Sequence, residues 1–345
     1  MIKNIFLILL FIPFLGFTQN KYSLKSRKTY KQAQESLKNG NNTEAMTLFK
    51  QCVSEEPKYI EAFHNMSVIE YGNKNYKSSI GYSQQALNLS KTKAPVYLQL
   101  AKSYFMIENY DSSAYYGQIA TLLDPNSDEA FYILAKSENN IKKYEKAFNH
   151  INKAININPN IADYYNVRGV SNFGLEKYDE ALSDFKQVLK LDPNNTSVYK
   201  NLANVYIAQN ESSKAIEYID KGILDSKGDE KVQYLILKGN YFRSLGKLDD
   251  AQAAYLEAKK ISNENPIVLT NLAAIMIDKG EFEGAVENCT KAIELDPTMT
   301  EAYFNRGIAN EMLRKTDEAC SDWEEAFILG AVKAEDYLNS PTCNE

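Results

Sequence analysis

Residues 266–299, PIVLTNLAAIMIDKGEFEGAVENCTKAIELDPTM, decide the fold of this chain. In the first half, Leu269, Leu272 and Met276 recur at three- and four-residue spacing, which places one apolar stripe along a helix. The second half shows the same kind of spacing and stops at Asp296-Pro297, because proline disfavours helix in the residue before it. The stretch therefore predicts two short helices that fold into a hairpin.

The hairpin pattern recurs along the chain with a period of 34 residues. The eighth and twentieth places of every repeat hold Ala, Ser or Gly, and bulky residues lie between these two columns. Small side chains let the two helices of a hairpin approach closely, while the bulky ones fill the remaining space. The predicted repeats are 26–59, 60–93, 94–127, 128–161, 162–195, 196–229, 232–265, 266–299 and 300–333.

These columns resemble the tetratricopeptide repeats, a family of helical hairpins with a 34-residue period. Most repeats also carry an aromatic residue at the fourth place, Tyr or Phe at the seventeenth and Pro at the thirty-second. The resemblance covers residues 26–333. It implies an all-α fold, a right-handed α-solenoid of about nine hairpins. Residues 331–345 are expected to form a capping helix and tail, because the last hairpin otherwise exposes an apolar face.

Two repeats depart from the pattern at the twenty-fourth place. Ser83 and Gly117 stand there in the second and third repeats, where most others have a bulky side chain. We expect these two repeats to pack more loosely, because they bury less apolar volume.

The N-terminal end has the features of a secretory signal peptide. Residues 1–18, MIKNIFLILLFIPFLGFT, combine Lys3, an apolar run and small residues placed for cleavage. The alternative, an uncleaved anchor, needs a run of roughly 20 apolar residues, which is longer than this one. Residues 19–25 would be a polar lead-in. The sequence thus predicts export to the periplasm or secretion, with membrane contact only through a partner or an uncleaved signal segment.

Composition narrows the possible partners. Each hairpin of a repeat array touches only its neighbours, so the repeats are counted as one quasi-linear domain. The formal net charge is −6. Nucleic-acid binding depends on Lys and Arg neutralising phosphates, and no basic cluster offers this.

No set of residues for catalysis or metal binding is evident. The chain has two histidines, His64 and His150, and neither is spaced from another His or Cys as metal ligands are. Acidic residues recur near the start of the second helices, where negative charge favours the helix dipole. Most tyrosines fall on packing columns and are interpreted as core. The sequence predicts no enzyme activity, no metal and no cofactor.

The resemblance places a binding groove on the first helices of the hairpins. Residues at the second, fifth, sixth, ninth and twelfth places of each repeat would line it. Asparagine recurs at the sixth place, and its amide both donates to and accepts from a peptide backbone. The alternative is that these are ordinary exposed polar residues, which need no partner. The candidate groove residues are Lys200, Asn201, Asn204, Asn240, Arg243, Asn271, Phe304 and Asn305, with Phe304 expected to be exposed.

One specialised form of the family grips the C-terminal carboxylate of cytosolic heat-shock chaperones. Lys200 and Asn204 match the start of that site, but Leu237 and Ile267 stand where it requires Asn and Lys. Together with the export signal, these departures argue against this binding mode.

The sequence therefore predicts a non-catalytic scaffold that binds a partner protein or peptide in its concave groove. One alternative is a holding chaperone for exported chains, although Asn, Lys and Gln interrupt the apolar groove that it would need. Another is a carbohydrate-binding or enzymatic groove, for which only carboxylates are at hand.

The four cysteines allow several pairings. Export permits disulfides. We predict a disulfide between Cys320, near the C-terminal cap, and Cys343 in the tail, and we expect Cys52 and Cys289 to be free and buried. A bridge between Cys289 and Cys320 and four free thiols remain the alternatives, because sequence does not fix connectivity.

Overall fold

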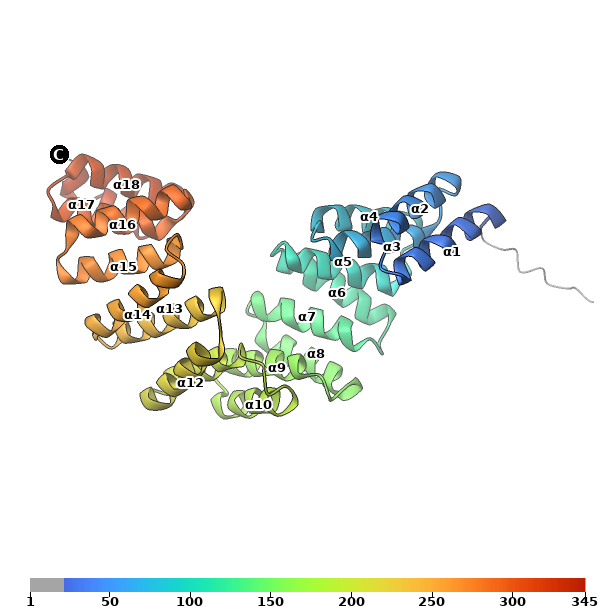
Figure 1. Ribbon diagram of the computed structural model, residues 1–345, viewed down its shortest axis with the longest axis horizontal. Coiled ribbons are helices and arrows are strands. Elements are labelled where there is room, and N and C mark those ends of the chain that lie inside the picture. The colour runs from blue at the N-terminus through green and yellow to red at the C-terminus, as the bar shows by residue number, and fades with distance from the viewer. Residues whose placement is uncertain (1–21, 345) are drawn as a thin grey trace, which may run out of the picture. The chain divides into compact units, whose positions relative to one another are not determined.

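The computed structural model describes residues 22–344, and this part of the chain consists of helices joined by short loops (Figure 1). The predicted signal peptide and the start of the lead-in lie outside the described residues. The first helices of the nine pairs are α1 (Leu24–Lys38), α3 (Ile60–Gly72), α5 (Ala94–Met106), α7 (Asp128–Asn140), α9 (Ala162–Gly174), α11 (Val198–Ala208), α13 (Gly228–Ser244), α15 (Pro266–Lys279) and α17 (Thr300–Met312). The second helices are α2 (Asn42–Glu55), α4 (Tyr76–Leu89), α6 (Tyr110–Leu123), α8 (Tyr144–Ile157), α10 (Tyr178–Leu191), α12 (Ser212–Asp225), α14 (Leu248–Ile261), α16 (Phe282–Leu295) and α18 (Thr316–Ile328). The nine predicted hairpins and the all-α fold class are confirmed.

The described part of the chain divides into two compact units, with the boundary after Pro159. The N-terminal unit contains α1–α8, and the C-terminal unit contains α9 onward. This division differs from the single domain predicted from the repeats. In a repeat array each hairpin packs mainly on its neighbours, so the array can part between two hairpins while each half keeps its own core.

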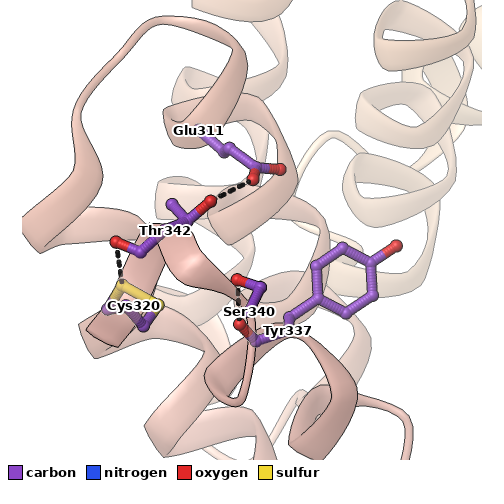
Figure 2. The surroundings of a disulfide bond; sticks show 6 residues. Glu311, Cys320, Tyr337, Ser340 and Thr342 are labelled. Atoms are coloured by element: carbon purple, nitrogen blue, oxygen red, sulfur yellow. Dashed lines mark hydrogen bonds between the residues drawn. A yellow bond between two sulfur atoms is a disulfide. The ribbon is translucent and has the colours of Figure 1, made fainter. Parts of the chain in front are cut away.

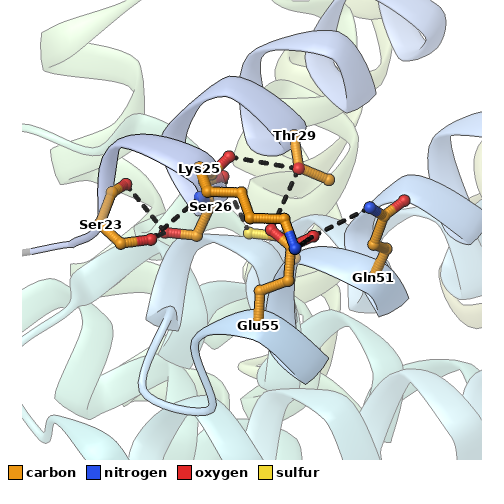
Figure 3. A network of polar contacts seen from close by, with 7 residues as sticks. Ser23, Lys25, Ser26, Thr29, Gln51 and Glu55 are labelled. Atoms are coloured by element: carbon orange, nitrogen blue, oxygen red, sulfur yellow. Dashed lines mark hydrogen bonds and ion pairs between the residues drawn. The ribbon is translucent and has the colours of Figure 1, made fainter.

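The first hairpin shows how polar side chains fix the helix ends (Figure 3). The hydroxyl of Ser23 caps α1 by accepting from the backbone N–H of Ser26 at 3.1 Å. On α2, Glu55 accepts from Gln51 and Thr29 and lies 3.2 Å from the ammonium of Lys25. The hydrogen bond from Gln51 and the interactions with Lys25 and Thr29 lower the pKa of Glu55. The network therefore ties the start of α1 to the end of α2.

Every turn between the two helices of a hairpin contains one residue with left-handed backbone, at the fifteenth place of its repeat. Three are glycines, and Gly280, with φ of 78°, ends α15. Six are not: Lys74, Glu108, Lys142, Glu176, Asn210 and Arg314. A side chain in this conformation costs roughly 1–2 kcal/mol, and asparagine tolerates it best. The tight turn between packed helices thus imposes the conformation on residues that disfavour it.

Replacing Glu176 with glycine is expected to stabilise the fifth repeat by about 0.5–1 kcal/mol, because glycine adopts positive φ without strain. Urea unfolding followed by circular dichroism measures the change. The matched control is Gly280→Ala, which should destabilise the eighth repeat by about 1 kcal/mol. A neutral Gly280→Ala would show that these turns relax to another conformation.

The two small columns pack as the sequence predicts. All nine residues at the twentieth place are completely buried or nearly so. In three repeats a glycine at the eighth place lies against an aromatic ring at the twenty-fourth. A Cβ on Gly169, Gly239 or Gly307 would come within 2.5 Å of Phe185, Tyr255 or Trp323. These rings therefore require the absence of a side chain opposite them.

The expectation of loose packing in the second and third repeats is wrong. At Gly117 the helices approach closely, because a Cβ there would lie 3.3 Å from Leu134. Ser83 is fully buried and donates to the hydroxyl of Ser67 at 3.0 Å. Ser79 donates to the backbone carbonyl of Ser67 at 2.8 Å. Close approach and buried hydroxyl hydrogen bonds thus replace the missing apolar bulk.

The two-residue insertion before the seventh repeat, Glu230-Lys231, is absorbed by a longer helix. α13 has 17 residues, whereas the other first helices have 11 to 15. It begins at Gly228, ahead of the predicted start of the repeat.

The C-terminal cap is shorter than predicted and has two parts. α19 (Ala334–Leu338) lies within the predicted capping helix, and α20 (Pro341–Asn344) follows it, unforeseen from the sequence. The hydroxyl of Thr342 donates to the carboxylate of Glu311 on α17 at 3.0 Å (Figure 2). The predicted pair Cys320 and Cys343 forms a disulfide with Cα atoms 5.6 Å apart. The tail is thus joined to both helices of the ninth hairpin.

Cys52 and Cys289 are free thiols buried in the core, which is where the sequence analysis places them. Burial raises the pKa of each to about 12. Both thiols therefore stay protonated in the folded protein.

The two free thiols should resist iodoacetamide at pH 8 in the native protein and react once it is unfolded without reductant. Because folding raises the pKa of both thiols, their burial in the protonated form contributes to the free energy of unfolding below pH 9. This contribution is lost as the pH rises from 9 towards 12. Mass spectrometry of labelled protein counts the thiols, and urea midpoints at pH 8 and 10 test the linkage. Rapid labelling of native Cys289 would contradict its burial.

Candidate protein-binding face

Hydrogen bonds between consecutive first helices define one face of each compact unit. In the C-terminal unit the amide of Asn201 on α11 donates to Asn166 on α9 at 2.8 Å. The guanidinium of Arg243 on α13 donates through Nε to Asp278 on α15 at 2.8 Å. In the N-terminal unit Asn65 on α3 donates to the hydroxyl of Tyr30 on α1 at 2.8 Å. We call this surface the first-helix face.

The predicted site residues divide into those that are already bonded and those that are not. Asn201 and Arg243 make the bonds just described, and Asn240 accepts from the hydroxyl of Tyr255 at 2.5 Å. Lys200 is exposed. The side chains of Asn204, Asn271 and Asn305 are partly exposed. They form no hydrogen bond with any other residue that the structure describes. Their amides are therefore the ones available to a ligand.

Phe304 is not exposed, so this part of the sequence prediction is wrong. Only 4% of its surface is accessible. The ring of Tyr337 on α19 meets it edge-on, with centroids 5.1 Å apart, and Lys333 Nζ lies 3.9 Å from its centroid. The cap returns over the first helix of the last repeat and occupies the place where a partner residue was expected.

On its first helices, the N-terminal unit has basic and aromatic residues that are not among the predicted groove residues. Lys102 on α5 lies over the ring of Tyr71 at 5.4 Å and bonds Glu129 at 2.7 Å. Lys136 on α7 lies over the ring of Phe105 at 4.7 Å. The two lysines share the ninth place of their repeats, and Tyr71 and Phe105 share the twelfth. This spacing was visible in the sequence, because the ninth and twelfth places are among those that the resemblance assigns to the groove.

The two histidines have different surroundings. His64 is half-buried, and burial lowers its pKa. His150 lies 2.7 Å from the buried carboxylate of Glu138 on the preceding helix. Among residues 22–344 no group of three or more His, Cys, Asp or Glu side chains is placed to hold a metal ion.

Two repeats contain the same buried polar set at their seventh, eleventh and twenty-third places. In the ninth repeat, Arg306 bonds Asp322 through two nitrogens, with its NH2 group at 2.7 Å. Asn310 donates to the same carboxylate at 3.1 Å. In the fifth repeat, Arg168 and Asn172 bond Asp184 in the same way. These sets join the first and second helices of their hairpins.

The Arg306 set lies at the base of a hollow of about 500 Å³ between α16, α17 and α18. Burial alone would lower the pKa of Arg306, but hydrogen bonds and the charge of Asp322 outweigh it, so the pKa is raised. Thr290 accepts from Arg306 at 3.2 Å. The charged and amide groups of this set thus bond one another, and Lys315, Asp317 and Glu318 also line the hollow.

Within residues 22–344, no helix is both long and apolar enough to cross a membrane.

Comparison with known proteins identifies the class that this fold defines. Tetratricopeptide repeat models match residues 128–161, 173–238 and 232–265, and a TPR repeat model matches 274–313. With nine hairpins of the expected period, the chain is a tetratricopeptide repeat protein.

Curated relatives match over single segments. RNA polymerase II-associated protein 3 of Mus musculus is 34% identical over 100 residues, which are 29% of this chain and 15% of that protein. Mitochondrial import receptor subunit TOM70 of Saccharomyces cerevisiae is 36% identical over 97 residues, 27% of this chain and 16% of the receptor. The chain thus spans about one sixth of the length of these relatives.

Solved structures share the fold over longer stretches. A tetratricopeptide repeat protein from Parabacteroides merdae covers 74% of this chain and all of its own, with a TM-score of 0.59 and 14% identity. Yeast Tom70 covers 91% of this chain and 93% of its own, with a TM-score of 0.50 and 15% identity. At these identities the likeness concerns the fold alone.

Proposed function

We propose that this protein is a scaffold that binds an extended segment of a partner protein on the first-helix face of its C-terminal unit and has no chemistry of its own. The observation that carries the proposal is the set of unbonded amides of Asn204, Asn271 and Asn305, each on a different first helix of this face. They lie in the sixth, eighth and ninth repeats, and amides spaced along one face suit an extended chain, because its backbone offers a donor and an acceptor at each residue.

The neighbouring residues support a polar ligand over an apolar one. Lys200 is exposed, and Arg243 lies on the same face at the twelfth place of its repeat. Arginine amid polar groups is common in binding hot spots. A holding chaperone would instead need a broad apolar surface. The acidic chain, with net charge −6, argues against nucleic acid as the ligand.

Replacing Asn204, Asn271 and Asn305 together with alanine should reduce partner capture at least tenfold, because each lost hydrogen bond contributes about 0.5–1.5 kcal/mol. Affinity purification of the tagged protein from its own organism, followed by mass spectrometry, measures capture. Asn201 makes its own bond to Asn166, so Asn201→Ala is the matched control for a structural effect. A single stoichiometric partner lost in the triple variant supports the scaffold. A broad mixture of unfolded chains favours a holding chaperone, and unchanged capture by the triple variant moves the site elsewhere.

We also propose that the protein is exported to the periplasm or secreted. The signal-like residues 1–18 and the disulfide between Cys320 and Cys343 support this, since disulfides persist in oxidising compartments. Fractionation of cells and N-terminal sequencing test it. A mature chain that begins near Gln19 in the exported fraction is the expected result, and an intact Met1 in the cytosolic fraction contradicts it.

A further inference from the structure

The cap covers a position that faces outward in the sixth repeat. Phe304 stands at the fifth place of α17, and the equivalent Lys200 on α11 is exposed. Phe304 is buried because Tyr337 and Lys333 lie on its ring. Tyr337 also lies against Trp323, with ring centroids 4.7 Å apart. One short helix of five residues therefore covers two aromatic side chains at once.

Ala334 of the cap is fully buried in the core of the ninth hairpin, Leu338 packs against this core, and one further attachment is covalent. Apart from the ring contacts, Thr342 donates to Glu311, and Cys343 is joined to Cys320 on α18 (Figure 2). α19 and α20 have five and four residues, which is too short for a helix to be stable alone in water. The cap therefore depends on its attachment to the ninth hairpin.

The disulfide is accessible to a reductant. Both cysteines are only partly buried and line a hollow of about 640 Å³ that Glu311 and Thr342 also border. The free thiols of Cys52 and Cys289 are fully buried. A reducing agent in solution can thus reach this bond, and the two buried cysteines are already thiols.

We propose that residues 331–344 are a disulfide-locked plug, and that reduction of Cys320–Cys343 by a dithiol releases the plug and exposes Phe304 and Trp323. In this reaction one thiolate of the dithiol attacks a sulfur of the bridge, and the S–S electron pair leaves with the other cysteine, which takes a proton. The second thiol of the dithiol then displaces the remaining cysteine as a thiol. Two electrons and two protons pass to the bridge, and the dithiol becomes a disulfide.

The exposed surface lies at the end of the first-helix face and takes one aromatic side chain of the partner, in place of Tyr337, while the rest of the partner segment contacts the polar amides. This role rests on the proposed scaffold function. The release of the plug does not, because it is measured on the full chain without any partner. The two ideas can therefore fail separately.

Trp323 is the single tryptophan of the chain, so its fluorescence reports this site alone. Adding dithiothreitol to the full-length protein should shift the emission to longer wavelength and increase quenching by acrylamide. Amide exchange in residues 331–343 should become on the order of 100-fold faster, which is the effect expected when a loop of this length is no longer closed. Exchange in α15 and α16 should stay unchanged.

Cys343→Ser is the matched variant, because it removes the bridge at the tail and leaves the hairpin core intact. It should show the released state without reductant, and dithiothreitol should then change nothing. Cys289→Ala should keep the full response. Emission and exchange that do not change on reduction would overturn the proposal, and so would an undiminished response to dithiothreitol in Cys343→Ser.

Discussion

Replacing Arg306 with alanine should destabilise the ninth hairpin by about 3 kcal/mol, at the lower end of the range for breaking a buried ion pair. The loss arises because Asp322, whose side chain is 8% exposed, is left in the core without the guanidinium that pairs with it. Water reaches Arg306, whose side chain is 22% exposed, so the upper end of the range is not expected. Urea unfolding followed by the fluorescence of Trp323, which lies in the same hairpin, measures the change.

Two further variants separate the buried charge from other causes. Lys221→Ala removes an exposed partner of Glu217 and should change stability by no more than about 0.5 kcal/mol. The double variant Arg306→Met with Asp322→Leu should recover much of the loss, because it leaves no unpaired charge. If Arg306→Ala proves as mild as Lys221→Ala, the pair does not hold the hairpin together.

Replacing Gly307 with alanine should destabilise the same hairpin by about 1–3 kcal/mol, the usual effect of overpacking a core. A Cβ at this place would lie 2.4 Å from Nε1 of Trp323, whose ring is fully buried and packed against Tyr337. The ring has no room to retreat without displacing the cap. A blue or red shift of the Trp323 emission should accompany the lower urea midpoint.

Gly81→Ala is the control for helix propensity, because Gly81 lies within α4 and nothing comes within 4 Å of a Cβ there. This substitution should stabilise the protein by about 0.5–1 kcal/mol. Both variants gain the same propensity, so the difference between them measures the contact with Trp323. Equal effects would mean that Gly307 is not required by packing.

At the C-terminal end, the sequence predicts the disulfide pair but not the bounds of the capping helices. Cys320 and Cys343 could be paired from their positions near the cap and in the tail, and the structure joins them. The start of the cap could not be placed, because Ala331–Lys333 has helical composition but lies in the turn after Gly330. The segment from Pro341 shows no apolar periodicity, and its helix forms where Cys343 and Thr342 attach it to the ninth hairpin.

By itself the sequence determined the period, the hairpins and the pairing of small and bulky columns. These features depend on contacts within one hairpin and between neighbouring hairpins. Similar residue types therefore recur at the same places of the repeats. Tertiary structure alone decided three others. Left-handed backbone at residues such as Glu176 follows from the close turn between packed helices. Tight packing at Gly117 follows from the approach of Leu134 on the next helix. Burial of Phe304 follows from the return of Tyr337, because a residue's exposure depends on what the rest of the chain places over it.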